Sequence, residues 1–271
     1  MKAFQDRKHE RFFLTGGRTG ALMVHGFPGT PAEMRPLAES LHGAGLTVEG
    51  LLLPGFGAQI ESLHLRHHRE WIEAVTGAMK KLRESCDRVI LVGYSMGAAI
   101  SLNVACEEAP PDGLLMLAPF WQLGERWQQP IWPLIRMVVR DFKPFEKADL
   151  SDPRVRSDLA NFMPDADFDD PETVGFIRGI SLPISLLDQV RSVGLAAWRV
   201  AGKVRTPAVI VQGTDDEIVP PARTRRLARR LNSDLEYHEI PADHHLIRPQ
   251  QNAFGRVEEI ALDFARRFQT D

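Results

Sequence analysis

One serine stands between two glycines in the segment GYSMG (residues 93–97), which matches the pattern G-x-S-x-G. The apolar run Val89–Val92 before it predicts a strand, and the small residues AAI after it are compatible with a helix. A strand that turns abruptly into a helix strains the residue at the turn and exposes its side chain at the end of the sheet. Glycine suits the flanking positions because helix and strand approach closely there. The segment therefore predicts Ser95 as a nucleophile.

A serine hydroxyl needs a base, and the base needs a partner that orients it. In folds with this turn the order along the chain is serine, acid, histidine. The segment AVIVQGTDDEIVPP predicts a buried strand followed by an acidic loop, in which Asp215 and Asp216 are the candidates. Strands that run parallel end at one edge of a sheet, so we expect this loop to lie near Ser95.

The base is expected in the segment LEYHEIPADHHLIRP, which predicts a strand followed by a loop with two histidines. We favour His245 over His244 as the base, because the following Leu246-Ile247 pair can anchor the loop. In this interpretation His244 points to solvent.

A serine hydrolase also needs N–H donors for the oxyanion of its tetrahedral intermediate. The backbone N–H of Met96, directly after the nucleophile, is one candidate. The second is the N–H of Phe27, in the loop of the segment ALMVHGFPGTP. His25 in the same loop is expected to support the loop backbone and not to act as the base.

Short apolar runs alternate with amphipathic runs over most of the chain, which predicts an α/β fold: a mostly parallel sheet with helices on both faces. Helices are predicted at 31–43, 71–82, 222–231 and 254–268, and strands at 12–14, 21–24, 46–53, 89–92, 114–117, 208–211 and 235–240. The first two strands flank the turn signal GGRTG, so we expect a hairpin or neighbouring strands.

The alternation stops between residues 120 and 200, where four of the five tryptophans and the acidic run PDADFDD occur. No strand is evident there. We predict a mainly helical cap insertion at 120–200 in a core made of residues 1–119 and 201–271. Trp121, Trp127, Trp132, Trp198 and the segment PIWPLIRMVV are expected to line an acyl pocket, to pack the cap on the core, or both.

The chain resembles the α/β-hydrolase superfamily, within it the bacterial carboxylesterase and monoacylglycerol-lipase group. The resemblance is carried by the segments HGFPGTP, REWIEAV, VILVGYSMGAAISL, GTDDEIVP and HHLI. It implies Ser95 as nucleophile, Asp216 (the third residue after Gly213) as acid, His245 as base, and the N–H groups of Phe27 and Met96 as oxyanion donors.

The resemblance implies a serine carboxylic-ester hydrolase whose partner is a small-molecule ester. A thioesterase, an acyltransferase or a carbon–carbon hydrolase would use the same residues, and a ligand-binding protein without turnover is the alternative from another class. No cofactor is expected. His64, His67 and His68 lack the carboxylate or cysteine pattern of a closed metal site, so no metal is expected either.

Composition narrows the partners further. The chain has 271 residues, two cysteines and a formal net charge of −3. That charge gives no electrostatic reason to expect nucleic acid or an anionic membrane surface as a partner. The sequence has no run of 18 apolar residues, so no stable membrane insertion is expected. Two cysteines do not make a disulfide framework, and we expect a cytoplasmic protein. The sequence does not specify an oligomeric state.

Overall fold

A seven-stranded sheet forms the centre of the molecule in a computed structural model, which describes residues 4–269 except 125–130, 133, 135, 136, 138 and 163–165. The strand order is β1-β3-β2-β4-β5-β8-β9, and only β1 runs antiparallel to its neighbour. The bounds are β1 Phe12–Leu14, β2 Thr19–Val24, β3 Thr47–Leu51, β4 Arg88–Tyr94, β5 Gly113–Leu117, β8 Ala208–Gly213 and β9 Leu235–Ile240. The predicted fold class, a mostly parallel sheet in an α/β architecture, is confirmed.

The expected pairing of the first two strands is wrong. β1 pairs with β3, which lies between β1 and β2, so the first two strands are neither a hairpin nor neighbours. The glycine-rich turn between them is held instead by the start of β3 and the residues just before it: the N–H of Gly17 donates to the carbonyl of Gly45 at 2.7 Å, and the N–H of Gly16 donates to the hydroxyl of Thr47 at 2.9 Å.

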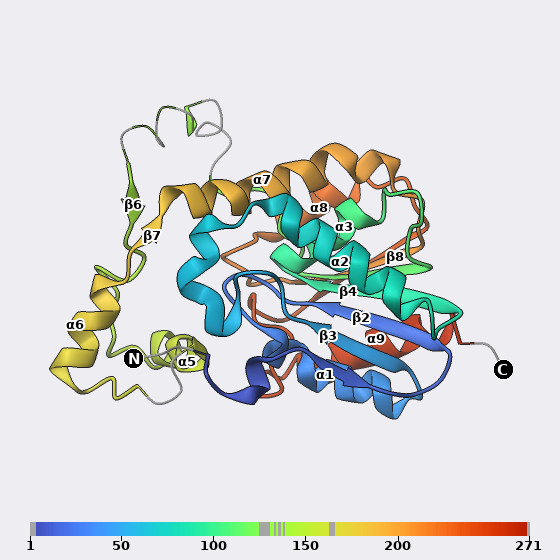
Figure 1. Cartoon of the computed structure of the whole chain (residues 1–271), viewed down its shortest axis with the longest axis horizontal. Coiled ribbons are helices and arrows are strands. Elements are labelled where there is room, and N and C mark those ends of the chain that lie inside the picture. Colours follow the sequence, from blue (N-terminus) through green and yellow to red (C-terminus); the bar gives the residue numbers. More distant parts are fainter. Residues whose placement is uncertain are drawn as a thin grey trace.

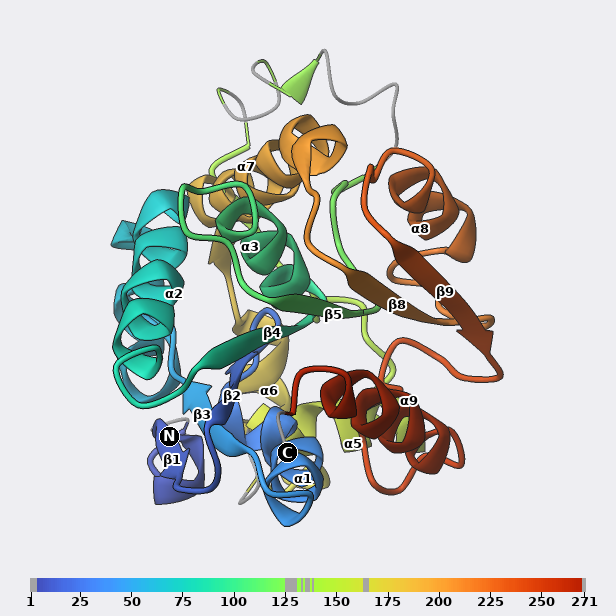
Figure 2. The same ribbon diagram turned by 90° about the vertical axis from the view of Figure 1, so that its right-hand side faces the viewer.

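Helices cover both faces of the sheet (Figure 2). α1 (Pro31–Gly43) and α9 (Phe254–Arg266) pack on one face. The other face carries α2 (His68–Leu82), α3 (Met96–Val104), α7 (Ile184–Val200) and α8 (Pro221–Ala228). Each face has its own apolar core, because the central strands β2, β4, β5 and β8 are buried on both sides.

Short 3₁₀ helices complete the main body: η1 (Arg7–His9), η2 (Gly57–Leu65) and η4 (Ala201–Lys203). His67 begins α2 with a capping box, in which its side chain accepts from the N–H of Arg69 and Glu70 accepts from the N–H of His67. This histidine therefore has a structural role at a helix N-terminus.

Between residues 120 and 183, the described part of the chain contains α5 (Pro153–Phe162), α6 (Pro171–Gly179) and two short strands, β6 (Asp141–Phe142) and β7 (Leu182–Pro183). They lie to one side of the central sheet (Figure 1). Leu150, Leu159 and Ile177 form a small apolar cluster of their own there. The expectation that this stretch lacks strands is wrong, because β6 and β7 pair antiparallel; two residues per strand are too few to produce an alternating pattern.

The last part of this stretch belongs to the main core. α7 packs along α3 and contributes Leu186, Val190 and Val193 to the larger apolar cluster. Trp121 stacks on Trp198 with 4.2 Å between ring centroids. The division of the chain at residues 120 and 200 stays a prediction, and α7 shares the core of the sheet.

Trp121 and Trp132 link the segment after β5 to the helices α8 and α7 by hydrogen bonds. The indole N–H of Trp121 donates to the carbonyl of Arg223 at 2.9 Å, and that of Trp132 donates to Asp188 at 2.6 Å. Trp127 and part of the segment 130–139 lie outside the described residues, and so does the beginning of the acidic run 164–170. None of the described helices combines the length and the apolar character that a membrane-spanning helix needs.

Candidate active site

Ser95 occupies a strained turn between β4 and α3. Its backbone has φ 51° and ψ −114°, a left-handed region that a residue other than glycine rarely adopts. Hydrogen bonds hold it from both sides: its N–H donates to the carbonyl of Leu117 at 2.8 Å, and its carbonyl accepts from the N–H of Phe120 at 3.2 Å. The end of β5 and the loop that follows it thus fix the backbone that carries the hydroxyl.

The two glycines around Ser95 are required by close backbone contacts. A Cβ atom on Gly97 would lie 2.0 Å from the carbonyl oxygen of Val24, at the end of β2. A Cβ atom on Gly93 would lie 2.6 Å from the backbone of Ala98 in α3. Both neighbours are backbone atoms that cannot move aside, so the turn can form only with glycine at these two positions.

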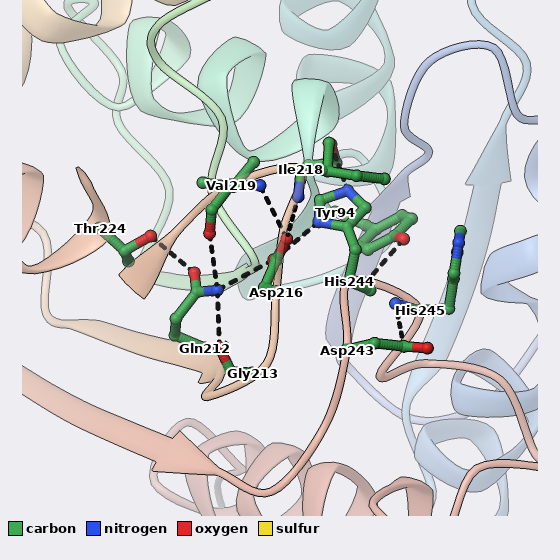
Figure 3. A network of polar contacts seen from close by, with 11 residues as sticks. Tyr94, Gln212, Gly213, Asp216, Ile218, Val219, Thr224, Asp243, His244 and His245 are labelled. Atoms are coloured by element: carbon green, nitrogen blue, oxygen red, sulfur yellow. Dashed lines mark hydrogen bonds and ion pairs between the residues drawn. The ribbon is translucent and has the colours of Figure 1, made fainter. Parts of the chain in front are cut away.

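His244, and not His245, connects the serine to the acid. Its Nε2 lies 3.0 Å from Ser95 Oγ, and its Nδ1 lies 2.8 Å from Asp216 Oδ2. The ring of His245 points away from Asp216 (Figure 3). The choice of His245 from the sequence is therefore corrected to His244.

The reason for the error is one residue of register in the loop after β9. The anchor that was expected does exist, because Leu246 and Ile247 are buried in the core. The phenol of Tyr94 also donates to the carbonyl of His244 at 3.0 Å, and Asp243 accepts from the N–H of His245 at 2.8 Å. These contacts turn the ring of the first histidine, not the second, toward β4.

Asp216 is a fully hydrogen-bonded buried carboxylate, 3% exposed. Its Oδ1 accepts from the N–H groups of Ile218 at 3.0 Å and Val219 at 2.7 Å. Its Oδ2 accepts from His244 and from the side-chain amide of Gln212 at 2.9 Å. Because three N–H donors other than the imidazole already face it, the group acts as an ionised acceptor, which places the proton of the His244–Asp216 bond on Nδ1 and leaves Nε2 to accept from Ser95.

The loops that carry the acid and the base are joined to each other. The N–H of Thr214 donates to the carbonyl of Ile240, and the N–H of Asp215 donates to the carbonyl of Ala242, both at 2.9 Å. A Cβ atom on Gly213 would lie 2.4 Å from the carbonyl oxygen of Ala242. Asp215, the alternative acid, is exposed, whereas Asp216 faces the histidine.

The loop after β2 lies directly beside the serine, since a Cβ atom on Gly26 would lie 3.2 Å from Ser95 Cβ. His25 supports this loop, as expected: its Nδ1 donates to the carbonyl of Gly26 at 2.9 Å, and its Nε2 accepts from the N–H of Leu53 at 3.2 Å. Complete burial lowers the pKa of His25 to about 4, which keeps the ring neutral.

No hydrogen bond within the described part of the chain occupies the N–H of Phe27 or of Met96. Met96 is the first residue of α3, where backbone N–H groups have no partner inside the helix. Both proposed oxyanion donors are therefore available beside the Ser95 turn.

Glu33 holds the same loop, a role that sequence analysis missed. Its Oε1 accepts from the N–H of Gly26 at 2.7 Å, and a Cβ atom on Gly29 would collide with its carboxyl group. The T-x-x-E pattern at Thr30–Glu33 suggests a helix capping box. The side chain of Thr30 makes no cap, because its hydroxyl pairs with His9 Nδ1 at 2.8 Å. Burial raises the pKa of Glu33 to about 7.

A strand–turn–helix serine hydrogen-bonded to a histidine and an aspartate that follow later strands of a mostly parallel sheet defines an α/β-hydrolase. The family model described as "Serine aminopeptidase, S33" matches residues 18–249, and the chain belongs to this family. The resemblance to the carboxylesterase and monoacylglycerol-lipase group is thereby confirmed at the level of the family.

Individual relatives agree with this assignment. The chain is 38% identical over 103 residues to a thermostable monoacylglycerol lipase of Bacillus sp. (strain H-257), over 38% of this chain and 40% of the lipase. It is 27% identical over 137 residues to a carboxylesterase of Bacillus subtilis (strain 168), over 50% of this chain and 54% of the relative. The matches thus span about half of the length of these curated relatives or less.

A similar fold occurs among solved structures. A structure described with the metagenome-derived lipolytic enzymes LipS and LipT superposes with a TM-score of 0.75 at 22% identity, over 96% of this chain and 98% of that one. At this identity the likeness concerns the fold.

Proposed function

We propose that the protein is a carboxylic-ester hydrolase that works through an acyl-enzyme on Ser95. The proposal is carried by one observation: His244 lies between Ser95 Oγ at 3.0 Å and Asp216 Oδ2 at 2.8 Å. The partial similarity to a monoacylglycerol lipase and a carboxylesterase supports an ester as the substrate.

In the first step, Ser95 Oγ attacks the carbonyl carbon of the ester while His244 Nε2 takes the hydroxyl proton. Asp216 holds the imidazole through Nδ1–H and stabilises the imidazolium that forms. The buried position of Asp216 strengthens this charge pair, because little water screens it.

The negative oxygen of the tetrahedral intermediate would be bound by the N–H groups of Met96 and Phe27. Met96 lies at the N-terminus of α3, where the helix dipole also favours negative charge. Phe27 lies in the loop that Glu33 and His25 hold against the Ser95 turn. The donors would thus be in position before the substrate binds.

The intermediate collapses when the imidazolium gives its proton to the leaving alcohol oxygen, and the acyl group stays on Ser95. Water then attacks the acyl carbonyl while His244 takes a proton from it. The second intermediate expels Ser95 Oγ, which takes that proton back, and the carboxylic acid leaves. No cofactor or metal takes part in these steps.

The substrates we propose are esters of short to medium acyl chains, including monoacylglycerols. A thioester, an acyl transfer to an alcohol or a carbon–carbon cleavage would use the same three side chains, so the substrate panel must separate them.

A fluorophosphonate probe tests the chemistry. We expect it to label the wild type at Ser95 and not the Ser95→Ala variant. Hydrolysis of p-nitrophenyl esters of increasing acyl length, with monoacylglycerols and thioesters alongside, then ranks the substrates. A folded wild type that neither reacts with the probe nor hydrolyses any ester above the Ser95→Ala background would identify a ligand-binding protein instead.

A further inference from the structure

Gln212 is a primary amide buried at the carboxyl end of β8, with 0% of its surface exposed. A buried amide that lacks hydrogen-bond partners destabilises the fold, so a chain that places one inside a strand of apolar residues must pair it. The neighbours of this amide are therefore informative about its role.

The amide nitrogen faces three acceptors: Asp216 Oδ2 at 2.9 Å, the carbonyl of Val219 at 3.1 Å and the carbonyl of Gly213 at 3.2 Å. The amide oxygen accepts from the hydroxyl of Thr224 in α8, at 2.6 Å (Figure 3). Exchanging the nitrogen and oxygen would turn the oxygen toward three acceptors. The surroundings thus permit one orientation of the amide.

The oxygen that Gln212 reaches is the one that binds the imidazole. Asp216 Oδ2 accepts from both Gln212 Nε2 and His244 Nδ1, whereas Oδ1 accepts from two backbone N–H groups. The backbone pair fixes one end of the carboxylate. The amide fixes the other end and draws part of its negative charge away from the imidazole.

We propose that Gln212, oriented by the buried hydroxyl of Thr224, is a positioning residue for the Asp216–His244 pair. It directs Oδ2 toward Nδ1 and lowers the basicity of the imidazole by sharing the charge of the carboxylate. The kinetic consequences of the inference rest on the proposed function. The series of hydrogen bonds from Thr224 to His244 can also be observed without turnover.

The kinetic test compares Gln212→Leu and Thr224→Val with the wild type in p-nitrophenyl ester hydrolysis. We expect kcat of Gln212→Leu to fall roughly tenfold with KM unchanged, because substrate does not contact the amide. Without the amide, Oδ2 carries more negative charge and stabilises the imidazolium. The acidic limb of the kcat/KM profile should therefore move to higher pH. A purely structural role would leave this limb in place.

Thr224→Val should change kcat and the acidic limb in the same direction by a smaller factor, and Thr224→Ser, which keeps the hydroxyl, should restore both. The matched control is Thr206→Val, a buried threonine just before the other end of β8 whose hydroxyl donates to the carbonyl of Pro111. It should leave the pH profile unchanged. If Gln212→Leu does not fold, the threonine series decides.

The readout without turnover is the Nδ1–H resonance of His244 in one-dimensional proton NMR, assigned by its loss in His244→Ala. Gln212→Leu and Thr224→Val should displace it, and Thr206→Val should not. An unmoved resonance together with an unmoved acidic limb would overturn the inference. The resonance could move in Gln212→Leu and Thr224→Val while the wild type shows no Ser95-dependent esterase activity. This result would leave the inference standing and refute the proposed function.

Discussion

Ser95 Oγ and His244 Nε2 lie 3.0 Å apart although 149 positions separate the two residues in the chain. The pair joins a turn after β4 to a loop after β9, and two strands, β5 and β8, lie between β4 and β9 in the sheet. The sheet is therefore what brings the hydroxyl to the imidazole.

Replacing each of the two adjacent histidines separates their roles. We expect His244→Ala to lower kcat for a p-nitrophenyl ester by about 10³-fold or more, because Ser95 loses its proton acceptor. His245→Ala should have a far smaller effect. Steady-state kinetics and the rate of fluorophosphonate labelling measure both variants, and equal losses in the two would contradict the assignment of His244.

The two adjacent aspartates make a similar pair. In Asp216→Asn, the N–H groups of Ile218 and Val219 should hold the amide oxygen in the position of Oδ1. The amide NH₂ would then face His244 Nδ1 and force the proton onto Nε2, where it cannot accept from Ser95. We expect kcat to fall about 10³- to 10⁴-fold. Asp215→Asn is the control and should retain activity in the same assay.

The close backbone contact at Gly97 leads to a prediction about stability. Gly97→Ala places a Cβ atom 2.0 Å from the carbonyl oxygen of Val24. We expect the free energy of unfolding to fall by about 3 kcal/mol, since backbone atoms must move apart. Gly77→Ala in α2 is the control, because nothing lies within 4 Å of its Cβ position. It should gain about 0.5–1 kcal/mol. Urea denaturation measures both, and a neutral Gly97→Ala would contradict the close approach.

The raised pKa of Glu33 should be visible in the pH dependence of stability. Burial raises its pKa from 4.5 to about 7, while the Gly26 N–H, His245 and Arg248 act in the opposite direction. The folded state therefore holds this proton more tightly than the unfolded state. Its contribution to stability is complete below pH 4.5 and is lost as the pH rises through about 7, with a limiting slope of about 1.4 kcal/mol per pH unit.

The effect of His25 on the pH dependence of stability has the opposite sign. Its pKa falls from 6.5 to about 4, so its contribution is complete above pH 6.5 and is lost as the pH falls through about 4. Between pH 4.5 and 6.5 the two effects offset each other in the wild type. The informative quantity is the difference in unfolding free energy between wild type and Glu33→Gln, measured in urea from pH 5 to 8. As the pH rises, the wild type should lose stability relative to Glu33→Gln. A difference that stays constant over this range would refute the prediction.

The strands and helices could be predicted because their signals are local. Each signal is contained in a short stretch of the chain: an apolar run in each of β4, β5 and β8, and a helical spacing of apolar residues in α1. The pairing of β1 could not, because its partner β3 comes after α1 and competes with the adjacent β2 for the same edge. A turn signal alone does not say which strand is paired.

Within the site, the order serine, acid, histidine was sufficient to find the three loops. It was not sufficient to choose between His244 and His245, because the choice depends on Tyr94, which contacts the histidine loop across the sheet. Gln212 and Glu33 were missed for the same reason: their partners lie on other elements. For Gln212, the visible signal was a glutamine inside the apolar run AVIVQG.

β9 is the outermost strand of the sheet on its side and is only partly buried, in contrast to β8. Strands at a margin open at a lower free energy than the interior does. If the margin frays, the imidazole departs while the serine turn stays folded. Warming should therefore abolish turnover before the far-ultraviolet circular dichroism changes, and cooling should restore it.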